Sequence, residues 1–310
     1  MERAAAIIAS VVPATPLVSF SVDGRTVFAK CESFQPTGAF KLRGGWYRLK
    51  TLSPSERARG VVAFSSGNHA QGVAWAANRL GIAAAIVMPS DAPANKIAAT
   101  RALGAEIILY DRVTQSREGI AAALSSARGA TLVPSFDDPW IVEGQGSAGI
   151  EIIAQLAAFD FGPPDAIVTP CGGGGLGAGL ALACPDAAIV VVEPDGWDDM
   201  GASLRTGCIV PVAPDAPPTA CDALMTQRVS NMTFEILARR GATGLSVSEI
   251  EIEAAIRFAF DRLRIVVEPG GAVALAALLC GKIAPTDRMV VIISGGNVDP
   301  THYAAVLGRS

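Results

Sequence analysis

Short apolar runs alternate with helical patterns along most of the chain, and this alternation constrains the fold more than any other feature. Alternation of this kind predicts parallel sheets whose strands are connected by helices, which is an α/β fold. The apolar runs that we interpret as strands lie at 60–64, 83–88, 106–109, 166–169, 188–193 and 289–293. The helical patterns lie at 70–80, 94–103 and 117–128, and another follows a glycine-rich turn at 171–179.

The alternation falls into two blocks, which predicts two open, twisted, mostly parallel sheets flanked by helices. A stretch rich in Pro and Asp at 134–139 marks the boundary between the blocks. We therefore predict a small domain at 52–138 and a large domain formed by 1–51 and 139–310. A chain of 310 residues is long enough for both to have hydrophobic cores.

Composition excludes several classes of protein. Half of the residues are hydrophobic, 17% are charged and the net charge is −4, so neither intrinsic disorder nor a basic nucleic-acid-binding protein is expected. The longest uncharged tract, 166–185, contains a proline and a run of glycines and is a poor membrane helix. The first residues lack a signal-peptide pattern. We expect a soluble, cytoplasmic protein that binds neither nucleic acid nor membrane.

The six cysteines form no CxxC pair and the chain has only two histidines, so we expect reduced thiols rather than a zinc site.

Chemistry is indicated instead by four other segments, and the first contains Lys41. This lysine follows a Pro-Thr-Gly turn and Phe40, and it precedes Arg43. Apolar neighbours and a second cation both lower an amine's pKa and make it a better nucleophile towards an aldehyde. Taken alone, Lys41 could equally be an ordinary lysine at a helix start.

The second segment, at 65–69, has the sequence SSGNH and joins the strand at 60–64 to the helix at 70–80. Backbone N–H groups and hydroxyls at a helix N-terminus favour anions, so we expect a carboxylate or phenolate oxygen to bind here. An ordinary helix cap would have a similar sequence.

The third segment contains four consecutive glycines, 172–175, between the strand at 166–169 and a helix. This arrangement can cradle a phosphate on backbone amides. It also satisfies GxGxxG, with Glu193 ending the next strand, which leaves a nicotinamide dehydrogenase open as an interpretation. Four consecutive glycines are more than that fingerprint requires, and they suit a loop wrapped around one phosphate. Such a run weakens packing unless a ligand approaches the backbone closely.

The fourth segment begins at Ser294, directly after the strand at 289–293. Ligands of open α/β sheets bind beyond the carboxyl ends of the strands, so this hydroxyl is placed to contact one.

In this order, the four segments resemble those of fold-type II pyridoxal-phosphate enzymes of the serine/threonine dehydratase and serine racemase group. The resemblance runs from about residue 15 to residue 299. It implies a fold like that of the tryptophan synthase β-subunit, and a homodimer.

In that family, the lysine that matches Lys41 binds pyridoxal 5′-phosphate (PLP) covalently and takes the substrate's α-proton. A neutral hydroxyl at Ser294 would face the pyridine nitrogen without keeping it protonated, which favours loss of a β-substituent over transamination. The resemblance implies that the remaining cofactor contacts come from Phe40 (ring), Asn68 (phenolic oxygen) and Gly172, Gly173, Gly174, Gly175 and Leu176 (phosphate). The substrate carboxylate is expected at Ser65, Ser66, Asn68 and His69.

Ser66 separates the branches of the family. Bacterial biosynthetic threonine dehydratases typically carry Ala at this position, whereas serine racemases and 3-hydroxyaspartate dehydratases carry Ser. A hydroxyl on the face opposite Lys41 would be a second catalytic proton donor, which racemisation requires. A purely helix-capping role for Ser66 stays open.

The acidic segment 193–199 resembles the magnesium or calcium loop of the racemase branch. There the ion is held by carboxylates that match Glu193 and Asp199 and by the backbone carbonyl at the position of Trp197. Oxygen ligands suit a hard divalent ion such as Mg²⁺, Ca²⁺ or Mn²⁺. A plain acidic loop is the alternative. Glu268 also matches the family, which implies that it lies near the cofactor ring.

The leading prediction is an ammonia-lyase (dehydratase) that converts L-threonine or L-serine to a 2-oxo acid and ammonia. We expect it to be catabolic, because no regulatory domain follows Ser310. A 3-hydroxyaspartate dehydratase or a serine racemase with the same site is the first alternative. A second substrate carboxylate would need another cation, which the sequence does not locate. An NAD-dependent oxidoreductase would leave Lys41 and Ser294 without a role, and a non-catalytic binding protein is the least favoured interpretation.

Overall fold

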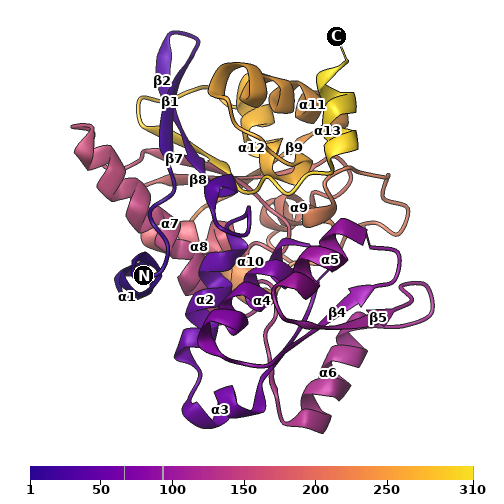
Figure 1. Ribbon diagram of the computed structural model, residues 1–310. Coiled ribbons are helices and arrows are strands. Elements are labelled where there is room, and N and C mark those ends of the chain that lie inside the picture. The colour runs from indigo at the N-terminus through magenta and orange to yellow at the C-terminus, as the bar shows by residue number, and fades with distance from the viewer. Residues whose placement is uncertain (66, 93, 310) are drawn as a thin grey trace.

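The computed structural model describes residues 1–65, 67–92 and 94–309, which contain two sheets with helices on both faces (Figure 1). The larger sheet has the strand order β1-β2-β10-β7-β8-β9 and the smaller one β5-β4-β3-β6. Neighbouring strands are parallel except in the β1–β2 hairpin. The strands are β1 (Leu17–Val22), β2 (Arg25–Cys31), β3 (Val61–Phe64), β4 (Ala84–Pro89), β5 (Glu106–Tyr110), β6 (Thr131–Leu132), β7 (Ala166–Pro170), β8 (Ala188–Pro194), β9 (Thr243–Val247) and β10 (Met289–Ile293).

The predicted fold class is confirmed, and each predicted strand lies within one residue of its expected bounds. The β1–β2 hairpin, the two-residue strand β6 and β9 were missed. The hairpin turn is Asp23-Gly24 with positive φ at both residues, which is the conformation that the Asp-Gly pair favours between antiparallel strands. That pair was therefore a usable signal.

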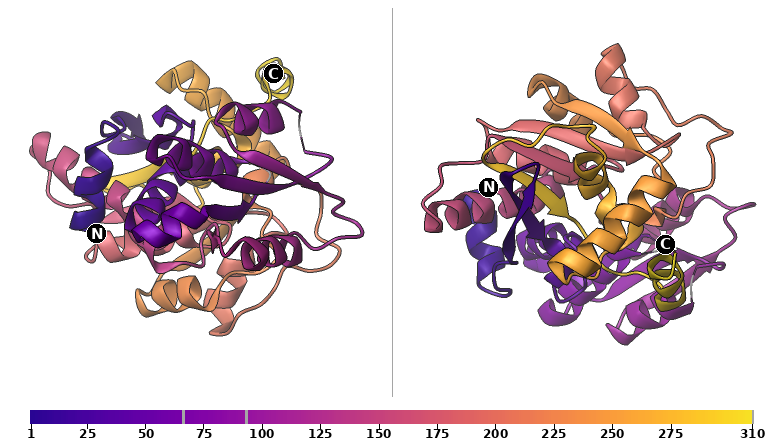
Figure 2. Two further views of the ribbon diagram at one scale, coloured as in Figure 1. Left: turned by 60° about the horizontal axis from the view of Figure 1, so that its bottom comes forward. Right: turned by 90° about the horizontal axis from the view of Figure 1, so that it is seen from above.

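Helices cover both faces of the larger sheet (Figure 2). Buried side chains of α11, α12 and α13 pack on one face, and those of α7 to α10 on the other. The long helix α7 begins where Asp138 accepts hydrogen bonds from two N–H groups of its first turn. The helices of this part are α7 (Pro139–Ala158), α8 (Gly175–Ala183), α9 (Asp199–Thr206), α10 (Asn231–Arg239), α11 (Glu249–Phe258), α12 (Pro269–Leu279) and α13 (Pro300–Leu307), with short helices η2 (Asp222–Leu224) and η3 (Ala259–Leu263).

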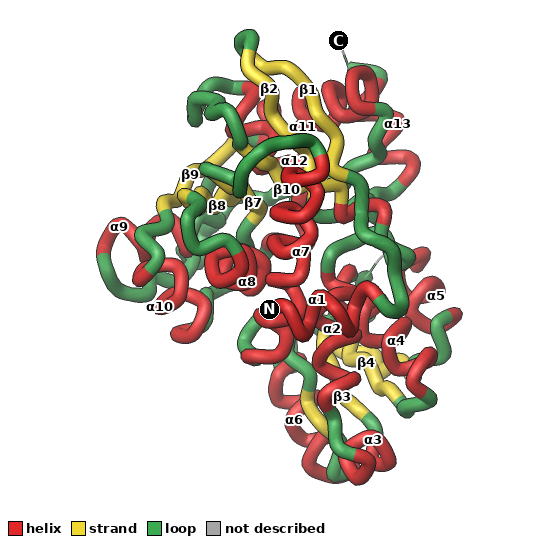
Figure 3. Tube along the Cα trace, turned by 90° about the vertical axis from the view of Figure 1, so that its left-hand side faces the viewer, coloured by secondary structure: helices red, strands yellow, loops and turns green. Residues whose placement is uncertain are grey.

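The smaller sheet lies at the other end of the molecule, with α7 and α2 between the two sheets (Figure 3). Side chains of α1, α2 and α4 share a hydrophobic cluster with β3 and β4, while α6 packs on the opposite face. The domain boundaries after residues 51 and 138 stay predictions. The helices here are α1 (Glu2–Ala9), α2 (Lys41–Thr51), α3 (Pro54–Arg59), α4 (Asn68–Leu80), α5 (Ala94–Ala102) and α6 (Arg117–Arg128), with the short helix η1 (Glu32–Phe34).

The carboxyl ends of three parallel strands bring the expected site segments together. Ser65 follows β3, Gly172 follows β7 after one residue, and Ser294 follows β10. Within the described ranges, we find no helix whose length and apolar character would let it cross a membrane.

Candidate active site

One cavity of about 770 Å³ opens at these strand ends, within the size range of small-molecule sites. Every cofactor residue predicted from the sequence lines it: Phe40, Lys41, Asn68, Gly172, Gly173, Gly174, Gly175, Leu176 and Ser294. Ser65 and His69 line it as well. Ser66 lies outside the described residues.

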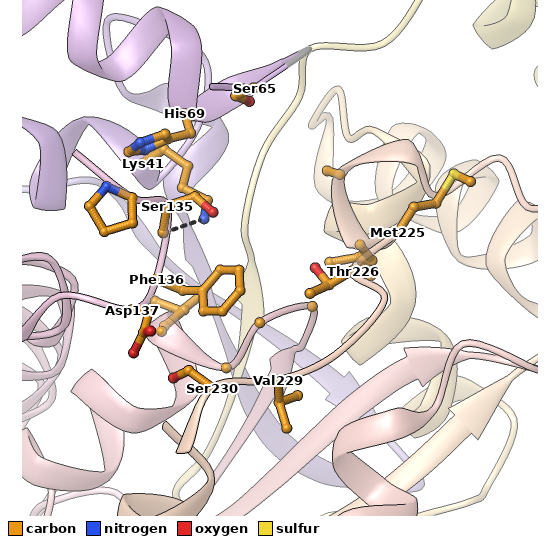
Figure 4. A pocket seen from close by; sticks show the side chains of 18 of the residues that line it. Lys41, Ser65, His69, Ser135, Phe136, Asp137, Met225, Thr226, Val229 and Ser230 are labelled. Atoms are coloured by element: carbon orange, nitrogen blue, oxygen red, sulfur yellow. Dashed lines mark hydrogen bonds between the residues drawn. The ribbon is translucent and has the colours of Figure 1, made fainter. Parts of the chain in front are cut away.

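Lys41 is the first residue of α2, and its Nζ donates a hydrogen bond of 2.9 Å to the carbonyl oxygen of Ser135 (Figure 4). Burial lowers the pKa of Lys41 to about 8, against an opposing effect of the Cys171 thiol. The predicted lowering of the pKa is therefore present, but one of its two predicted causes is wrong. Arg43 is not among the groups that shift the pKa of Lys41.

Arg43 has a different environment because its buried guanidinium belongs to a network of ion pairs that is buried except at Glu151. It donates to Glu32 and to Glu151 at 2.7 Å each, and Lys30 donates to the same Glu151 at 2.6 Å. Two carboxylates thus neutralise two buried cations, so Arg43 presents no net charge to the cavity. The Arg43 side chain is 0% exposed.

The start of α4 supplies the donors of the predicted anion site. The hydroxyl of Ser65 accepts a hydrogen bond from the Gly67 N–H at 3.2 Å. His69 is held through Nε2 by the carbonyl oxygen of Val133 at 2.9 Å, while its Nδ1 is buried without a partner among the described residues. Burial and the charge of Lys41 lower the pKa of His69 to about 3, so the ring is neutral.

The glycine run has a reason that the sequence did not reveal. A Cβ at Gly173 would collide with the Phe136 ring, and a Cβ at Gly174, which has φ +85°, would collide with Met200. A Cβ at Gly175 would make a tight contact of 3.0 Å with Cβ of Phe136. Neighbouring protein atoms thus favour glycine at these positions, and Phe136 lines the same cavity as the glycine run. Close approach of a phosphate stays a prediction. Within the described residues, the N–H groups of Gly172 and Gly173 meet no backbone acceptor.

The segment 37–40 is hydrogen-bonded to the segment that follows β10. The Phe40 N–H donates to the Ser294 carbonyl oxygen at 3.0 Å, and the Gly296 N–H donates to the Gly38 carbonyl oxygen at 2.8 Å. These bonds place the Ser294 side chain and Lys41 on the wall of the same cavity although 253 positions separate them in the chain.

The acidic loop lies outside the cavity wall, behind the glycine run. Both oxygens of Glu193 accept backbone N–H groups at the start of α9, from Met200 at 3.1 Å and Gly201 at 2.8 Å. One oxygen of Asp199 accepts from the Val229 N–H, and the other is buried without a partner among the described residues. Burial raises the pKa of Asp199 to about 7 and that of Glu193 well above its usual value.

Sequence reasoning missed two further parts of the cavity wall. The loop 134–137 supplies the partner of Lys41 and the Phe136 ring, and the loop 222–231 forms the opposite wall with Thr226, Val229 and Ser230 (Figure 4). Two cations of the wall, Arg117 and Arg228, were also missed. The loop 134–137 follows the two-residue strand β6, which the sequence pattern did not predict, and the loop 222–231 follows no strand directly.

Comparison with known proteins matches the same segments. The sequence profile described as "Pyridoxal-phosphate dependent enzyme" matches residues 8–295. An L-threo-3-hydroxyaspartate ammonia-lyase from Pseudomonas sp is 44% identical, over 92% of this chain and 88% of that protein. A serine racemase from Schizosaccharomyces pombe is 42% identical, over 95% and 92%. The crystal structure of a threonine deaminase from T.th. superposes with a TM-score of 0.88 at 40% identity, covering 96% of this chain and 97% of that one.

Proposed function

The chain belongs to the family of pyridoxal-phosphate dependent enzymes, and from this premise we propose that it converts a small β-hydroxy amino acid to a 2-oxo acid and ammonia. The observation that carries the proposal is a buried lysine of lowered pKa on the wall of one cavity. The same wall contains the glycine loop, with unpaired backbone N–H groups, and the first residues of helix α4. The nicotinamide alternative is set aside. The matched family uses a different cofactor, and the Glu193 carboxylate caps α9 rather than facing a ribose site.

The residues of the cavity fit the cofactor. The unpaired N–H groups of Gly172 and Gly173, with Gly174 and with Gly175 and Leu176 at the start of α8, would hold its phosphate. Phe40 would lie along the ring, Asn68 would reach the phenolic oxygen and Ser294 the pyridine nitrogen. When bound, PLP supplies an electron-withdrawing group that stabilises negative charge on the substrate's α-carbon.

Lys41 would carry the cofactor and then move the substrate's proton. With a pKa of about 8, its Nζ is neutral in a substantial fraction of molecules near neutral pH and can accept the α-proton. The carbonyl oxygen of Ser135 keeps this nitrogen on the cavity wall. Ser66, which lies outside the described residues, is proposed as a second proton donor on the basis of the family resemblance.

The substrate carboxylate would be held at the start of α4. Ser65 has a hydroxyl donor there, and the first N–H groups of α4 are directed outward from the helix. His69 donates its Nε2 proton to Val133, so its neutral Nδ1 is an acceptor. The donors for a carboxylate are thus Ser65, Asn68 and the helix start, and His69 shapes the site beside them.

A specific observation favours a second candidate substrate, the dicarboxylate 3-hydroxyaspartate, over threonine and serine. A second carboxylate needs a cation, and the cavity wall contains two arginines. The Nε of Arg117 donates to Glu118 at 2.7 Å, which leaves its terminal N–H groups for a ligand. Arg228 has no ion-pair partner in the part of the chain that the structure describes. The Pseudomonas relative is named for this substrate.

The experiment is 2-oxo acid release by purified protein with PLP and Mg²⁺, on L-threonine, L-serine, D-serine and both diastereomer pairs of 3-hydroxyaspartate. Lys41→Ala should lose both turnover and covalently bound cofactor, while Lys50→Ala on the same helix should keep both. Turnover retained by Lys41→Ala would reject the mechanism. No release from any compound would reject the elimination reaction.

The substrate choice has its own test. Arg117→Leu should lower kcat/KM for 3-hydroxyaspartate by at least about tenfold and leave threonine turnover unchanged, because only the dicarboxylate has a group for this cation. Arg128→Leu at the other end of α6 is the matched control. Equal losses on both substrates would assign Arg117 a structural role instead.

We propose that Glu193, Asp199 and the Trp197 carbonyl hold a divalent cation such as Mg²⁺. The unpartnered oxygen of Asp199 and the raised pKa of both carboxyl groups support this, because a cation would stabilise two neighbouring buried charges. The described residues contain no group of three or more His, Cys, Asp or Glu side chains that could hold a metal, so backbone carbonyls or water would complete the ligands.

Metal binding should raise the thermal midpoint, and more so at pH 8 than at pH 6. The folded-state pKa values are raised, so without metal these groups destabilise the fold as pH rises through about 7, and a cation offsets that loss. Asp199→Asn should abolish the effect of Mg²⁺, and an effect that survives would reject the site.

A homodimer and a cytoplasmic location stay predictions; light scattering of the purified protein tests the first.

A further inference from the structure

The side-chain amide of Asn68 is held from two sides by residues to which the proposed mechanism gives no role. Its Nδ2 donates to Oε1 of Glu268 at 2.6 Å, and its Oδ1 accepts from Nδ2 of Asn297 at 2.8 Å. Asn68 is 8% exposed and Glu268 is 2% exposed, so water does not compete for these bonds. Each end of the amide therefore has one fixed partner.

We propose that Glu268 is a positioning residue which, together with Asn297, fixes the orientation of the Asn68 amide and reserves its second N–H group for an acceptor in the cavity. An ionised carboxylate only accepts hydrogen bonds, so it selects the NH₂ end of Asn68. The amide group of Asn297 donates, so it selects the oxygen. A flipped Asn68 would face oxygen with oxygen and N–H with N–H.

The inference rests on the proposed function, in which Asn68 contacts the phenolic oxygen of PLP. That oxygen is an acceptor and needs an N–H group. An amide free to rotate would present its oxygen in part of the molecules and would repel the phenolate. Glu268 and Asn297 thus form a clamp on Asn68. Because of this clamp, the amide presents an N–H group and not its oxygen to the cavity before the cofactor binds.

The surrounding backbone leaves space for this clamp. A Cβ at Gly295 would overlap the carboxylate of Glu268, and a Cβ at Gly38, which has φ +71°, would overlap the Asn297 side chain. Asn297 Nδ2 also donates to the Thr37 carbonyl oxygen at 2.8 Å. The clamp therefore connects Asn68 to the segment that leads into Lys41 and to the segment that follows β10.

The charge state of Glu268 decides how firmly the amide is held. Burial, and next the charge of Asp222, raise the pKa of Glu268 to about 7, while the Asn68 hydrogen bond and Lys96 on α5 oppose the shift. Above this pH the carboxylate is an acceptor only. Below it the protonated group can also donate, and the flipped amide becomes acceptable. The orientation is thus enforced above pH 7.

The test is PLP binding to the apoprotein, followed by fluorescence, with the visible absorbance of the bound cofactor recorded from pH 6 to pH 9. In Glu268→Gln the new amide can face Asn68 with either end. We expect PLP affinity to fall by about tenfold above pH 7 and the absorbance profile to lose the step near pH 7. Glu251→Gln, at the start of α11 and paired with Lys282, is the matched control.

Asn297→Ser supplies a second variant at a partly exposed position, so the test does not depend on the folding of Glu268→Gln. It should also weaken PLP binding, because it removes the donor that holds the Asn68 oxygen. Unchanged affinity and an unchanged absorbance profile in these variants would overturn the inference, as would equal destabilisation of apoprotein and holoprotein with a normal cofactor spectrum. Failure of the unmutated protein to bind PLP would instead reject the proposed function.

Discussion

At Lys41 the protein buries an amine that has no carboxylate partner among the residues the structure describes. The carbonyl oxygen of Ser135 accepts a hydrogen bond from Lys41 Nζ, and the ring centre of Phe40 lies 5.1 Å from this nitrogen. A carbonyl dipole offsets only part of the hydration that an ammonium group loses on burial, so the neutral form is favoured. Arg43, two residues further along the chain, is also buried, but it stays charged because it pairs with the carboxylates of Glu32 and Glu151.

The lowered pKa of Lys41 predicts how cofactor attachment depends on pH. The rate of covalent PLP binding to the apoprotein should rise with pH and level off with a midpoint near pH 8, because only neutral Lys41 is nucleophilic. Stopped-flow absorbance from pH 6 to pH 10 measures the rate, with a short lysine peptide as control. A rate that keeps rising towards pH 10, as for the peptide, would contradict the lowered pKa.

The glycine loop and helix α8 illustrate how an element depends on a distant segment. The Phe136 ring packs where a side chain at position 173 would otherwise lie. This contact holds the loop in the conformation in which the N–H groups of Gly172 and Gly173 remain without backbone acceptors. The strand–turn–helix order is thus local, but the shape of the turn is set by a loop almost forty positions earlier.

Gly173→Ala should therefore destabilise the protein by about 1–3 kcal/mol, as overpacking typically does, and weaken PLP binding. Urea unfolding and a PLP titration measure the two effects. Adding Phe136→Ala to Gly173→Ala should recover part of the PLP affinity, because the ring that collides is gone. Gly162→Ala is the control, since a Cβ there makes only ordinary contacts. A normal Gly173→Ala protein would contradict the packing argument.

Across the whole molecule, the network of Lys30, Arg43, Glu32 and Glu151 joins the larger sheet to the helices between the two sheets. Its members come from β2, η1, α2 and α7, and it is buried apart from Glu151, whose side chain is 14% exposed. Nearby cations hold the pKa of Glu32 at about 2 despite its burial. A network of this kind is costly to break at one member, because the others remain buried without a partner.

Arg43→Leu should thus lower the free energy of unfolding by about 3–5 kcal/mol. Urea unfolding at neutral pH measures it, and Arg239→Leu, which breaks an exposed i,i+4 pair, should change nothing measurable. The loss should shrink in acid as the released carboxylates become protonated. A loss as small as that of the control would show that the network does not hold the helices against the larger sheet.

Local patterns in the sequence were sufficient for the fold class and for the strand-end segments that meet in the cavity. Apolar runs and helical periodicity reflect backbone geometry within a few residues, and chemistry-bearing segments after strands converge because the carboxyl ends of parallel strands share an edge. Lys41, Asn68, the glycine loop and Ser294 were found in this way. The hairpin β1–β2 had a local signal as well, in Asp23-Gly24.

Tertiary structure alone decided the properties that depend on distant neighbours. The pKa of Lys41 follows from burial and not from Arg43, and glycine at position 173 is required by the Phe136 ring. The arginines on the cavity wall come from a loop and a helix without a motif. The clamp on Asn68 joins positions 200 and 229 residues away. Burial and hydrogen-bond pairing arise between residues that only the folded chain brings together, so no local pattern encodes them.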